Sequence, residues 1–438
     1  MEQDLEVKIV SVETIKPSLP PSSHPKTLIL SVLDQVFPAM HVSVLLFYSP
    51  TPQVGDVVSD LKTSLSQTLD QFYPLAGRFG DDSTISCNDH GIPFIETKVN
   101  CHLSAFMTSP HKLKLVNKFL PTRELIPLTI QVNVFLCGGV VIGCYLLHKL
   151  FDGASIGIFL KYWSALAGKR FKDLVQPDFE ARIEAFPPLP SKGEQLLHET
   201  PPSQSSPTTT VIKSFLFNSA ALSKLRDKAT SEVVPRPTKF EAVAGFVWEQ
   251  ALAVARDSGA QVEHTMFSMT VNMRPRMRPP LPQESMGNLL TNARAQVDTS
   301  SRHQLQELVK EIHLALSRTN QKITTTYQGN NPPEVIWSAR KAELQGISDH
   351  KDGGTFRLSS WCNLGLNEAD FGFGKPVWIV PTDGRIIPPT VAHFIYLTNY
   401  NHPINGEGIE AWFFLEEKEM QVLESNPHFL AFASPNYL

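Results

Sequence analysis

Residues 143–160 read "GCYLLHKLFDGASIGIFL": an apolar run that ends at His148, an aspartate four positions later, and Gly153 opening a second apolar segment. The first run continues "VVIGCYLL", which is typical of a buried strand, and the second has apolar residues at helical spacing. The stretch therefore predicts a strand that ends at His148 and a helix that begins just after Asp152. Mixed sheets often present functional side chains at strand ends, so His148 is a candidate for proton transfer near neutral pH.

Asp152 has a structural explanation that requires no chemistry. A carboxylate just before a helix accepts hydrogen bonds from free amides of the first turn and complements the helix dipole. The spacing of His148 and Asp152 could also place both on a metal ion, but such a site needs a third ligand, and the other histidines form no supporting cluster. We predict no metal site.

The same stretch contains "GASIG", which matches the serine-hydrolase pattern G-x-S-x-G. A nucleophile elbow places its serine on the sharp turn directly after a strand, with a glycine-rich oxyanion loop upstream. Here "HKLFDG" separates the strand from Ser155, which would lie inside the helix. A hydrolase that uses Ser155 is kept as the alternative function, together with a non-catalytic binding protein on the same fold.

Residues 125–147, before the histidine, carry no charge and are long enough to cross a bilayer. Their first half alternates polar and apolar residues in "TIQVNV", which is the period of a strand. Gly138 and Gly139 then lie between two β-branched runs, as in a hairpin turn. We predict two strands of a buried sheet and no membrane association.

The composition gives no electrostatic case for nucleic acid as a partner. The 438 residues include 39 basic and 43 acidic side chains, for a net charge of −4, and 42% of the residues are hydrophobic. Phosphate binding requires a basic excess, which is missing. Five scattered cysteines without a C-x-x-C pair and an N-terminus without a signal sequence predict a cytoplasmic protein with reduced thiols.

The clearest composition shift is the proline- and serine-rich stretch at residues 186–210. Proline fixes φ and removes a backbone donor, so this stretch cannot form a sheet interior or a long helix. We predict two domains, residues 1–187 and 211–438, joined by a linker at 188–210. Helical and strand patterns alternate in both parts, which indicates a mixed α/β fold. A second proline-rich stretch, residues 273–288, is predicted to be a functional loop.

The segment "EADFGFGKP" contains the D-F-G triplet of protein kinases, but the rest of the kinase motif set and a phosphate-binding loop are missing. Gly372 and Gly374 instead favour a turn with unusual backbone angles. The carboxylate of Asp370 would then need a cation, and the candidates are Arg274 and Arg276.

Together, "HKLFDG" and "DFGFGKP" resemble the H-x-x-x-D and D-F-G-W-G pair of the BAHD acyl-CoA-dependent acyltransferases of plants. Further stretches match along nearly the whole chain and in the same order: "FYPLAGRF", "CNDHGIPFIE", "TKFEAVAGFVWEQ", "VNMRPRMRPPLP" and "SSWC". The resemblance implies a two-domain fold like that of chloramphenicol acetyltransferase, with a channel at the domain interface.

The resemblance also implies roles for individual residues. The histidine that matches His148 is the general base of the family, and the acceptor alcohol attacks the thioester directly in a ternary complex. Asp152 and Gly153 would maintain the local structure. Asp370 is counted with the catalytic machinery through a salt bridge to an arginine, for which Arg274 is the first choice by its place in "NMR".

Three residues are expected to line the channel or contact CoA, namely Ser359 and Trp361 of "SSW" and Thr238. The sequence departs from the family at Phe373, where relatives have tryptophan, and at Asn363, where many have arginine. We expect these departures to affect details of the channel or acceptor site and to leave the catalytic histidine untouched.

The resemblance implies an acyl-CoA co-substrate and no permanently bound cofactor. The match leans toward the branch that acetylates alkaloids and terpenoids, so acetyl-CoA is the expected donor and a hydroxyl of a plant specialised metabolite the expected acceptor. Because the sequence shows no basic cluster, a neutral or cationic small-molecule acceptor is favoured over a polyanionic one. The expected protein is a cytoplasmic monomer.

Overall fold

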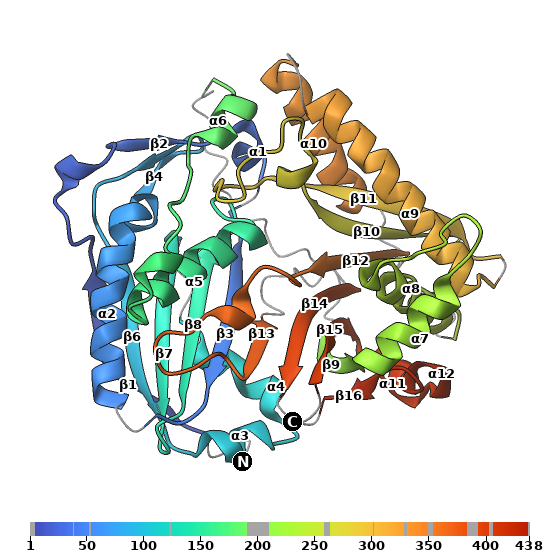
Figure 1. Ribbon diagram of the computed structural model, residues 1–438, viewed down its shortest axis with the longest axis horizontal. Coiled ribbons are helices and arrows are strands. Elements are labelled where there is room, and N and C mark those ends of the chain that lie inside the picture. Colours follow the sequence, from blue (N-terminus) through green and yellow to red (C-terminus); the bar gives the residue numbers. More distant parts are fainter. Residues whose placement is uncertain are drawn as a thin grey trace.

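The structure of the protein is a computed structural model in which two lobes, each built on one large sheet, lie side by side (Figure 1). The structure describes these residues: 5–37, 39–51, 54–121, 125–190, 210–257, 263–300, 302–327, 331–348, 354–382, 393–402 and 406–436. Most of the predicted linker, residues 191–209, lies outside this part of the chain.

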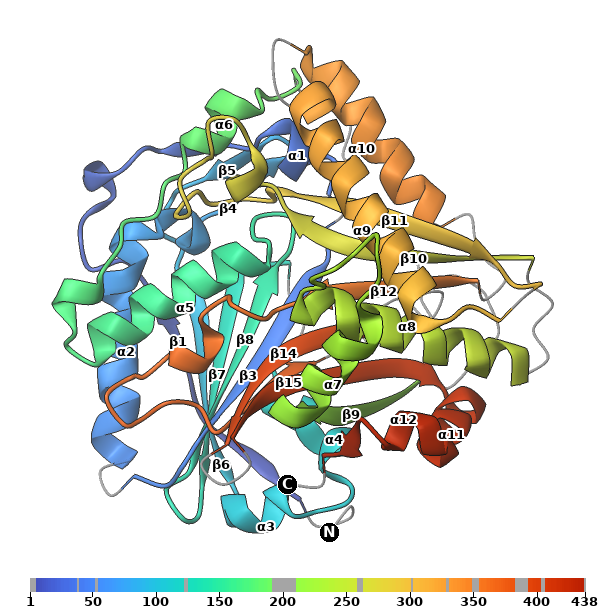
Figure 2. The same ribbon diagram turned by 45° about the vertical axis from the view of Figure 1, so that its right-hand side comes forward.

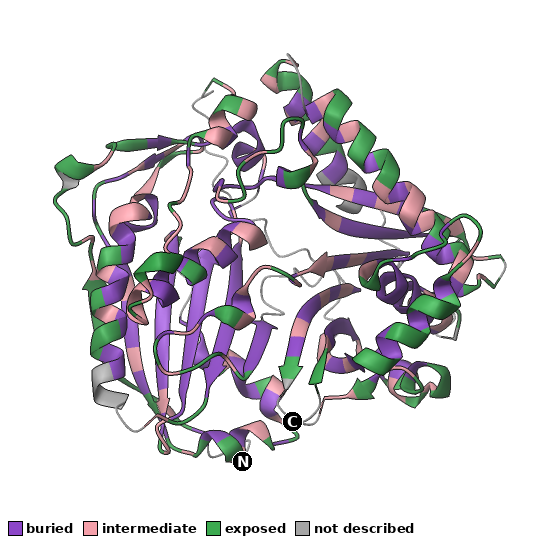
Figure 3. Cartoon of the chain, in the orientation of Figure 1, coloured by how far each residue is buried: buried purple, intermediate pink, exposed green. Residues whose placement is uncertain are grey.

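The first lobe contains a six-stranded sheet, called sheet 1. Its strands in spatial order are β1 (Val7–Ile15), β6 (Ile92–Val99), β7 (Leu128–Phe135), β8 (Val140–Leu147), β3 (His41–Tyr48) and β13 (Trp378–Thr382). Every residue of β3 and β8 is buried, and Figure 3 shows these central strands purple along their length. Apolar side chains of α2 (Val54–Gln71) and α5 (Gly153–Ala167) cover one face.

The predicted hairpin is confirmed by β7 and β8, which pair antiparallel around a turn in which Gly138 has a φ of 81°. A left-handed φ is accessible to glycine without steric cost, so the residue suits this turn. Both strands are buried between layers of protein. Among the described helices, none has the length and apolarity needed to cross a bilayer.

The second lobe contains a seven-stranded sheet, called sheet 2. Its strands in spatial order are β11 (Leu290–Asp298), β10 (His264–Asn272), β12 (Thr355–Ser360), β14 (Phe394–His402), β15 (Gly406–Glu416), β9 (Thr210–Asn218) and β16 (Ser434–Pro435). Helices that pack on its outer face are α7 (Ser219–Ala229), α8 (Lys239–Asp257), α9 (Leu305–Lys322) and α11 (Glu417–Ser425).

Shorter elements complete the chain. A small sheet contains β2 (Thr27–Ile29), β5 (Thr84–Ser86) and β4 (Arg78–Asp81). The remaining α-helices are α1 (Val32–Gln35), α3 (Leu103–Met107), α4 (Lys112–Leu115), α6 (Ala181–Ala185), α10 (Pro333–Ser348) and α12 (Pro427–Leu430). The other helical turns used below are η5 (Arg274–Arg276), η6 (Ile323–Tyr327) and η7 (Leu366–Glu368).

The second half of the chain contributes one strand to the sheet of the first lobe. After β12 the chain leaves sheet 2, crosses to the first lobe through η7, and adds β13 antiparallel to β3 at the edge of sheet 1 (Figures 1 and 2). The mixed α/β class and the two lobes agree with the sequence. The domain limits 1–187 and 211–438 stay a prediction, to which the structure adds that the second half completes the sheet of the first.

Candidate active site

His148 directly follows the last residue of β8, as the sequence predicted. Its backbone amide donates to the carbonyl of Met40 at 2.6 Å, which ties the strand end to the segment that leads into β3. The imidazole stacks on the ring of Phe37 with a centroid distance of 4.4 Å and an interplanar angle of 16°. The side chain is half-buried between these neighbours, so its ring orientation is fixed while part of it stays accessible.

Asn288 determines which nitrogen of the imidazole can act as a base. Its Nδ2 donates to the carbonyls of His148 and Lys149 at 2.8 and 3.0 Å, and its Oδ1 lies 3.0 Å from Nδ1 of His148. An amide oxygen only accepts hydrogen bonds, which assigns the proton to Nδ1 and leaves the lone pair on Nε2. Among the described residues, no side chain or carbonyl forms a hydrogen bond with Nε2.

The pKa of His148 lies below its usual value. Burial is the largest cause, and the positive charge of Arg340 acts in the same direction, while Asp152 and the bond from Asn288 oppose the shift. The imidazole is therefore neutral near pH 7, which is the protonation state that a general base needs.

Asp152 begins helix α5 and also forms the main ion pair of the site. Its Oδ1 accepts from the amide of Ser155 at 2.9 Å, as expected for a capping carboxylate. The guanidinium of Arg274 contacts the two carboxylate oxygens at 2.8 and 3.1 Å, and the amide of Leu289 adds a bond at 3.1 Å. Both charged side chains are almost fully buried. The loop at 274–289 is thereby attached to the start of α5.

The expected salt bridge between Asp370 and Arg274 is wrong, because Arg274 pairs with Asp152 instead. Arg276 is no substitute, since its guanidinium contacts Asn320 and a backbone carbonyl. The carboxylate of Asp370 accepts from the amides of Gly372 and Gly374 at 2.8 and 2.9 Å.

The D-F-G-F-G loop is thus closed by its own aspartate. Its two glycines have φ of 98° and 104°, left-handed angles that the turn requires. Asp370 forms no hydrogen bond or ion pair with His148 in the described part of the chain. Asp370 was expected to belong to the catalytic machinery, but its contacts are those of a residue that maintains the loop. The next residue, Phe371, packs edge-to-face on Trp163 of α5 and on Tyr48 of β3.

Ser155 lies in the first turn of α5 with no exposed surface. Its hydroxyl donates to the carbonyl of Gly287 at 3.2 Å and accepts from the amide of the same residue at 3.0 Å, and Arg274 contacts it at 3.2 Å. A hydroxyl that is buried and saturated in this way cannot reach a substrate. The small residues of "GASIG" instead permit close packing, since a Cβ on Gly157 would lie 2.2 Å from the carbonyl oxygen of Leu364.

The three residues expected to line the channel have different surroundings. Trp361 is buried next to the start of α5, where a Cβ on Gly153 would lie 3.9 Å from the indole nitrogen. Ser359, in β12, is partly exposed and lies beside Tyr396 of β14. Thr238 is exposed and caps α8, exchanging bonds of 2.8 and 3.1 Å with Glu241, so the structure gives it a capping role.

Asn288 and the residues that hold it were not among the site residues predicted from the sequence. The amide of Asn288 donates to Oδ1 of Asp34 at 2.8 Å, and the other oxygen of Asp34 accepts from Arg182 at 3.0 Å. This ion pair is almost fully buried. "SVLD" at residues 31–34 is a capping-box pattern that could have indicated the aspartate. A lone asparagine in a proline-rich loop gives no comparable signal.

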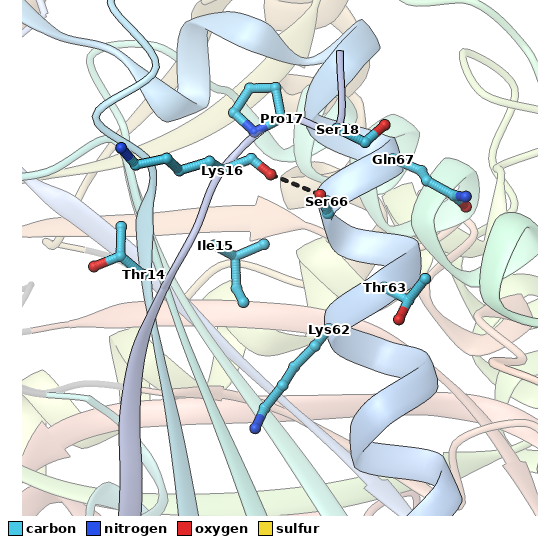
Figure 4. Close-up of a pocket in the computed structure, with 9 residues that line it drawn as sticks. All are labelled: Thr14, Ile15, Lys16, Pro17, Ser18, Lys62, Thr63, Ser66 and Gln67. Atoms are coloured by element: carbon cyan, nitrogen blue, oxygen red, sulfur yellow. Dashed lines mark hydrogen bonds between the residues drawn. The ribbon is translucent and has the colours of Figure 1, made fainter. Parts of the chain in front are cut away.

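A cavity of about 560 Å³ lies elsewhere, on the outer surface between the end of β1 and helix α2. Figure 4 shows that polar side chains such as Lys16, Lys62 and Gln67 line it. None of the candidate catalytic residues belongs to this lining.

Comparisons with known proteins match nearly the whole chain. A family model described as the transferase family matches residues 5–430. Stemmadenine O-acetyltransferase of Catharanthus roseus is 32% identical over 442 residues, which cover 96% of this chain and 97% of that enzyme. Limonoid 21-O-acetyltransferase of Melia azedarach is 30% identical over 443 residues, which cover 99% of each chain.

The crystal structure of vinorine synthase is similar over the whole chain. It superposes with a TM-score of 0.82 at 27% identity and covers 99% of this chain and 100% of its own. The predicted two-lobe acyltransferase fold is thereby confirmed. The chain belongs to the transferase family of BAHD acyl-CoA-dependent acyltransferases.

Proposed function

We propose that the protein transfers an acetyl group from acetyl-CoA to a hydroxyl of a plant alkaloid or terpenoid, with His148 as general base. The observation that supports this most directly is the fixed, neutral imidazole with its lone pair on Nε2. Two relatives named as O-acetyltransferases of stemmadenine and of a limonoid support the donor and the acceptor classes. A cytoplasmic monomer is part of the proposal, in line with five cysteines that remain thiols.

The reaction needs one proton carrier and no covalent enzyme intermediate. Nε2 of His148 takes the proton of the acceptor hydroxyl while the oxygen attacks the thioester carbon. When the tetrahedral intermediate collapses, the C–S bond breaks and the proton passes from Nε2 to the departing sulfur of CoA. Holding donor and acceptor together supplies proximity, and the Nδ1–H bond to Asn288 keeps the ring aligned through both transfers.

The proposal is tested by measuring CoA release from acetyl-CoA with a panel of hydroxylated alkaloids and terpenoids. We expect His148→Ala to lower acceptor-dependent kcat by roughly 10²–10⁴-fold, because proton transfer contributes about that much. Ser155→Ala should lose stability, since buried bonds to Gly287 and Arg274 disappear, but keep its kcat per folded molecule. A fully active histidine variant, or a serine variant that folds and is inactive, would contradict the mechanism.

A further inference from the structure

The face of sheet 2 that is not covered by α7, α8, α9 and α11, called its inner face, contacts sheet 1 and is partly exposed. Aromatic residues of its strands β14 and β15, among them Phe394 and Phe414, share a hydrophobic cluster with Phe47 and Tyr145 of sheet 1. Away from this cluster, partly exposed residues alternate with buried ones along β11: Asn292 and Arg294 are partly exposed, and Ala293 and Ala295 are buried. The alternation is the pattern of a strand with one face covered by helices and one open.

Two arginines lie in one row on this inner face. Arg294 of β11 pairs with Ser268 of β10, and Ser268 pairs with Arg357 of β12. Residues paired across a sheet project to the same side, and two strand spacings separate the arginine backbones by about 10 Å. The row continues into Phe394 of β14, and Tyr396 follows on the same strand, so an aromatic wall borders the end of the row that carries Arg357.

The carboxylate closest to Arg294 is shared among several other donors. Glu343 of α10 is the nearby carboxylate, and its oxygens already accept from Arg340 and Lys322 at 2.6 Å and from Tyr327 at 2.7 Å. Arg294 contacts the backbone carbonyl of Glu343, and its Nε is buried without a hydrogen-bond partner in the described part of the chain. The Nε–H group of Arg294 is therefore a donor that a bound anion could use.

The like charges influence each other. The pKa of Arg357 is lowered to about 10. Burial is the larger cause, and the positive charge of the neighbouring Arg294 is the second. Both guanidinium groups are still cationic at neutral pH, and bringing a carboxylate between them would relieve the repulsion.

A short series of contacts connects this row to the catalytic histidine. Phe37 stacks on His148, and the guanidinium of Arg340 lies 5.7 Å from the centroid of the same phenyl ring. Arg340 binds Glu343, whose backbone carbonyl accepts from Arg294. On the other side, β12 runs from Arg357 past Ser359 to Trp361 beside the start of α5. The elements that carry the row and the histidine, β11, β12 and β8, lie in the two lobes that face each other in Figure 2.

We infer that Arg294 and Arg357 form a carboxylate subsite for the acyl acceptor, which is an apolar skeleton that carries an acid group in addition to the acetylated hydroxyl. The inference rests on the proposed function and narrows its acceptor class. It differs from the expectation of a neutral or cationic acceptor, because arginines that are distant in the chain, on β11, α10 and β12, come together only in the fold. A carboxylate fits a bidentate guanidinium contact, and the aromatic wall fits the skeleton.

The phosphates of CoA and the carboxylate of a dicarboxylic acyl donor are the other sources of an anion. The strongly hydrated phosphates would have to be desolvated beside Phe394 and Tyr396, which costs more than placing a single carboxylate there. A dicarboxylic acyl donor would require a co-substrate other than acetyl-CoA, which is the expected donor. The acceptor is therefore the assigned source, and the experiment separates all three.

The test uses hydroxylated terpenoid and alkaloid acids, each paired with its methyl ester, as acceptors for acetyl-CoA. We expect the wild type to prefer the acids by about 10- to 100-fold in kcat/KM, since hydrogen bonds to a charged group are worth that much. Arg294→Gln and Arg357→Gln should remove the preference by raising KM for the acids and leaving the esters unchanged. Arg294→Lys should keep part of it, and Arg318→Gln, on the exposed surface of α9, all of it.

Binding of the same compounds to His148→Ala, measured by calorimetry, separates this inference from the proposed function, because it requires no turnover. Acids that bind more tightly than esters, with the difference lost in the double variants that add Arg294→Gln or Arg357→Gln, support the subsite even if no acetyl transfer occurs. Equal binding of acids and esters, or a preference that survives both arginine changes, overturns it.

Two donor arms identify the source of the anion. A loss confined to malonyl-CoA relative to acetyl-CoA in the arginine variants would assign the carboxylate to the acyl group. A rise in KM for acetyl-CoA that is absent with S-acetyl-N-acetylcysteamine, which has no phosphates, would assign the arginines to CoA. Either result overturns the acceptor subsite, and unchanged donor parameters support it.

Discussion

At the scale of the residue, the site depends on which partner each polar side chain has, and the histidine is the clearest case. Its Nδ1 faces an amide oxygen and its ring faces a phenyl group, so neither contact supplies a full negative charge. A carboxylate at Nδ1 would raise the pKa of the imidazole. A larger fraction of the histidine would then be protonated near pH 7 and unable to act as a base. The asparagine orients the ring without that effect.

We expect Asn288→Ala to change both the rate and the pH dependence. Without the bond at Nδ1 either tautomer is populated, and kcat should fall by roughly 10- to 100-fold. The bond also raises the pKa of His148, so its loss lowers that pKa further. Because the base is active only when neutral, the acidic limb of the pH–rate profile should move to lower pH. A fall in kcat with an unmoved limb would mean that Asn288 only supports the fold.

The two motif aspartates differ in the same way, by their partners. Asp152 is buried against Arg274, whereas Asp370 caps its own exposed loop. Asp152→Asn leaves a buried guanidinium without its counter-ion and should lower the free energy of unfolding by about 3–5 kcal/mol. Asp370→Asn keeps an oxygen for the two glycine amides and should cost less than about 1 kcal/mol. Urea unfolding of the two variants compares them directly, and equal losses would contradict the pairing.

At the scale of the element, local sequence patterns predicted where strands, helices and turns begin and end. They could not predict which residues distant in the chain form contacts. The end of β8 at His148, the cap at Asp152 and the hairpin at Gly138 each follow from a few neighbouring residues. The partner of Arg274 does not, because an arginine can reach any of several carboxylates and only the placement of its loop against α5 decides between them. Asn288 was hidden for the same reason, since its contacts lie about 140 residues away in the chain.

The D-F-G-F-G loop shows how one element tolerates a departure from its family. Phe373 packs edge-to-face on Tyr48 at a centroid distance of 4.9 Å and borders a cavity of about 230 Å³ between the loop, α2 and the end of α5. The phenyl ring keeps the aromatic contact and leaves space beside it.

Phe373→Trp should therefore stabilise the protein. The larger indole fills part of the cavity and buries more apolar area, which is worth about 1 kcal/mol and a Tm higher by a few degrees. Phe373→Leu, which loses the aromatic contact, is the matched control and should lower Tm. Calorimetry of both variants checks the prediction, which fails if the tryptophan variant melts below the wild type.

At the scale of the whole molecule, the position of β13 makes the sheet of the first lobe dependent on the second half of the chain. Sheet 1 would end at β3 without it, and Trp378 and Val380 of β13 would leave the cluster that joins the two sheets. A long, apolar edge strand is prone to aggregation. The position of the histidine between the lobes thus relies on a strand that follows it by more than 200 residues.

Cutting the chain within residues 191–209 tests this dependence. Residues 1–190 expressed alone lack β13 and should aggregate or fail to unfold cooperatively, because β3 is left as an uncovered edge. Co-expression with residues 210–438 should restore a soluble complex that co-purifies and releases CoA from acetyl-CoA, since β13 then completes sheet 1. The control is the fragment 1–190 fused to residues 366–382, which contain η7 and β13 and should recover part of the solubility. If residues 1–190 alone give a cooperative thermal transition, the first lobe is an independent domain that does not require β13.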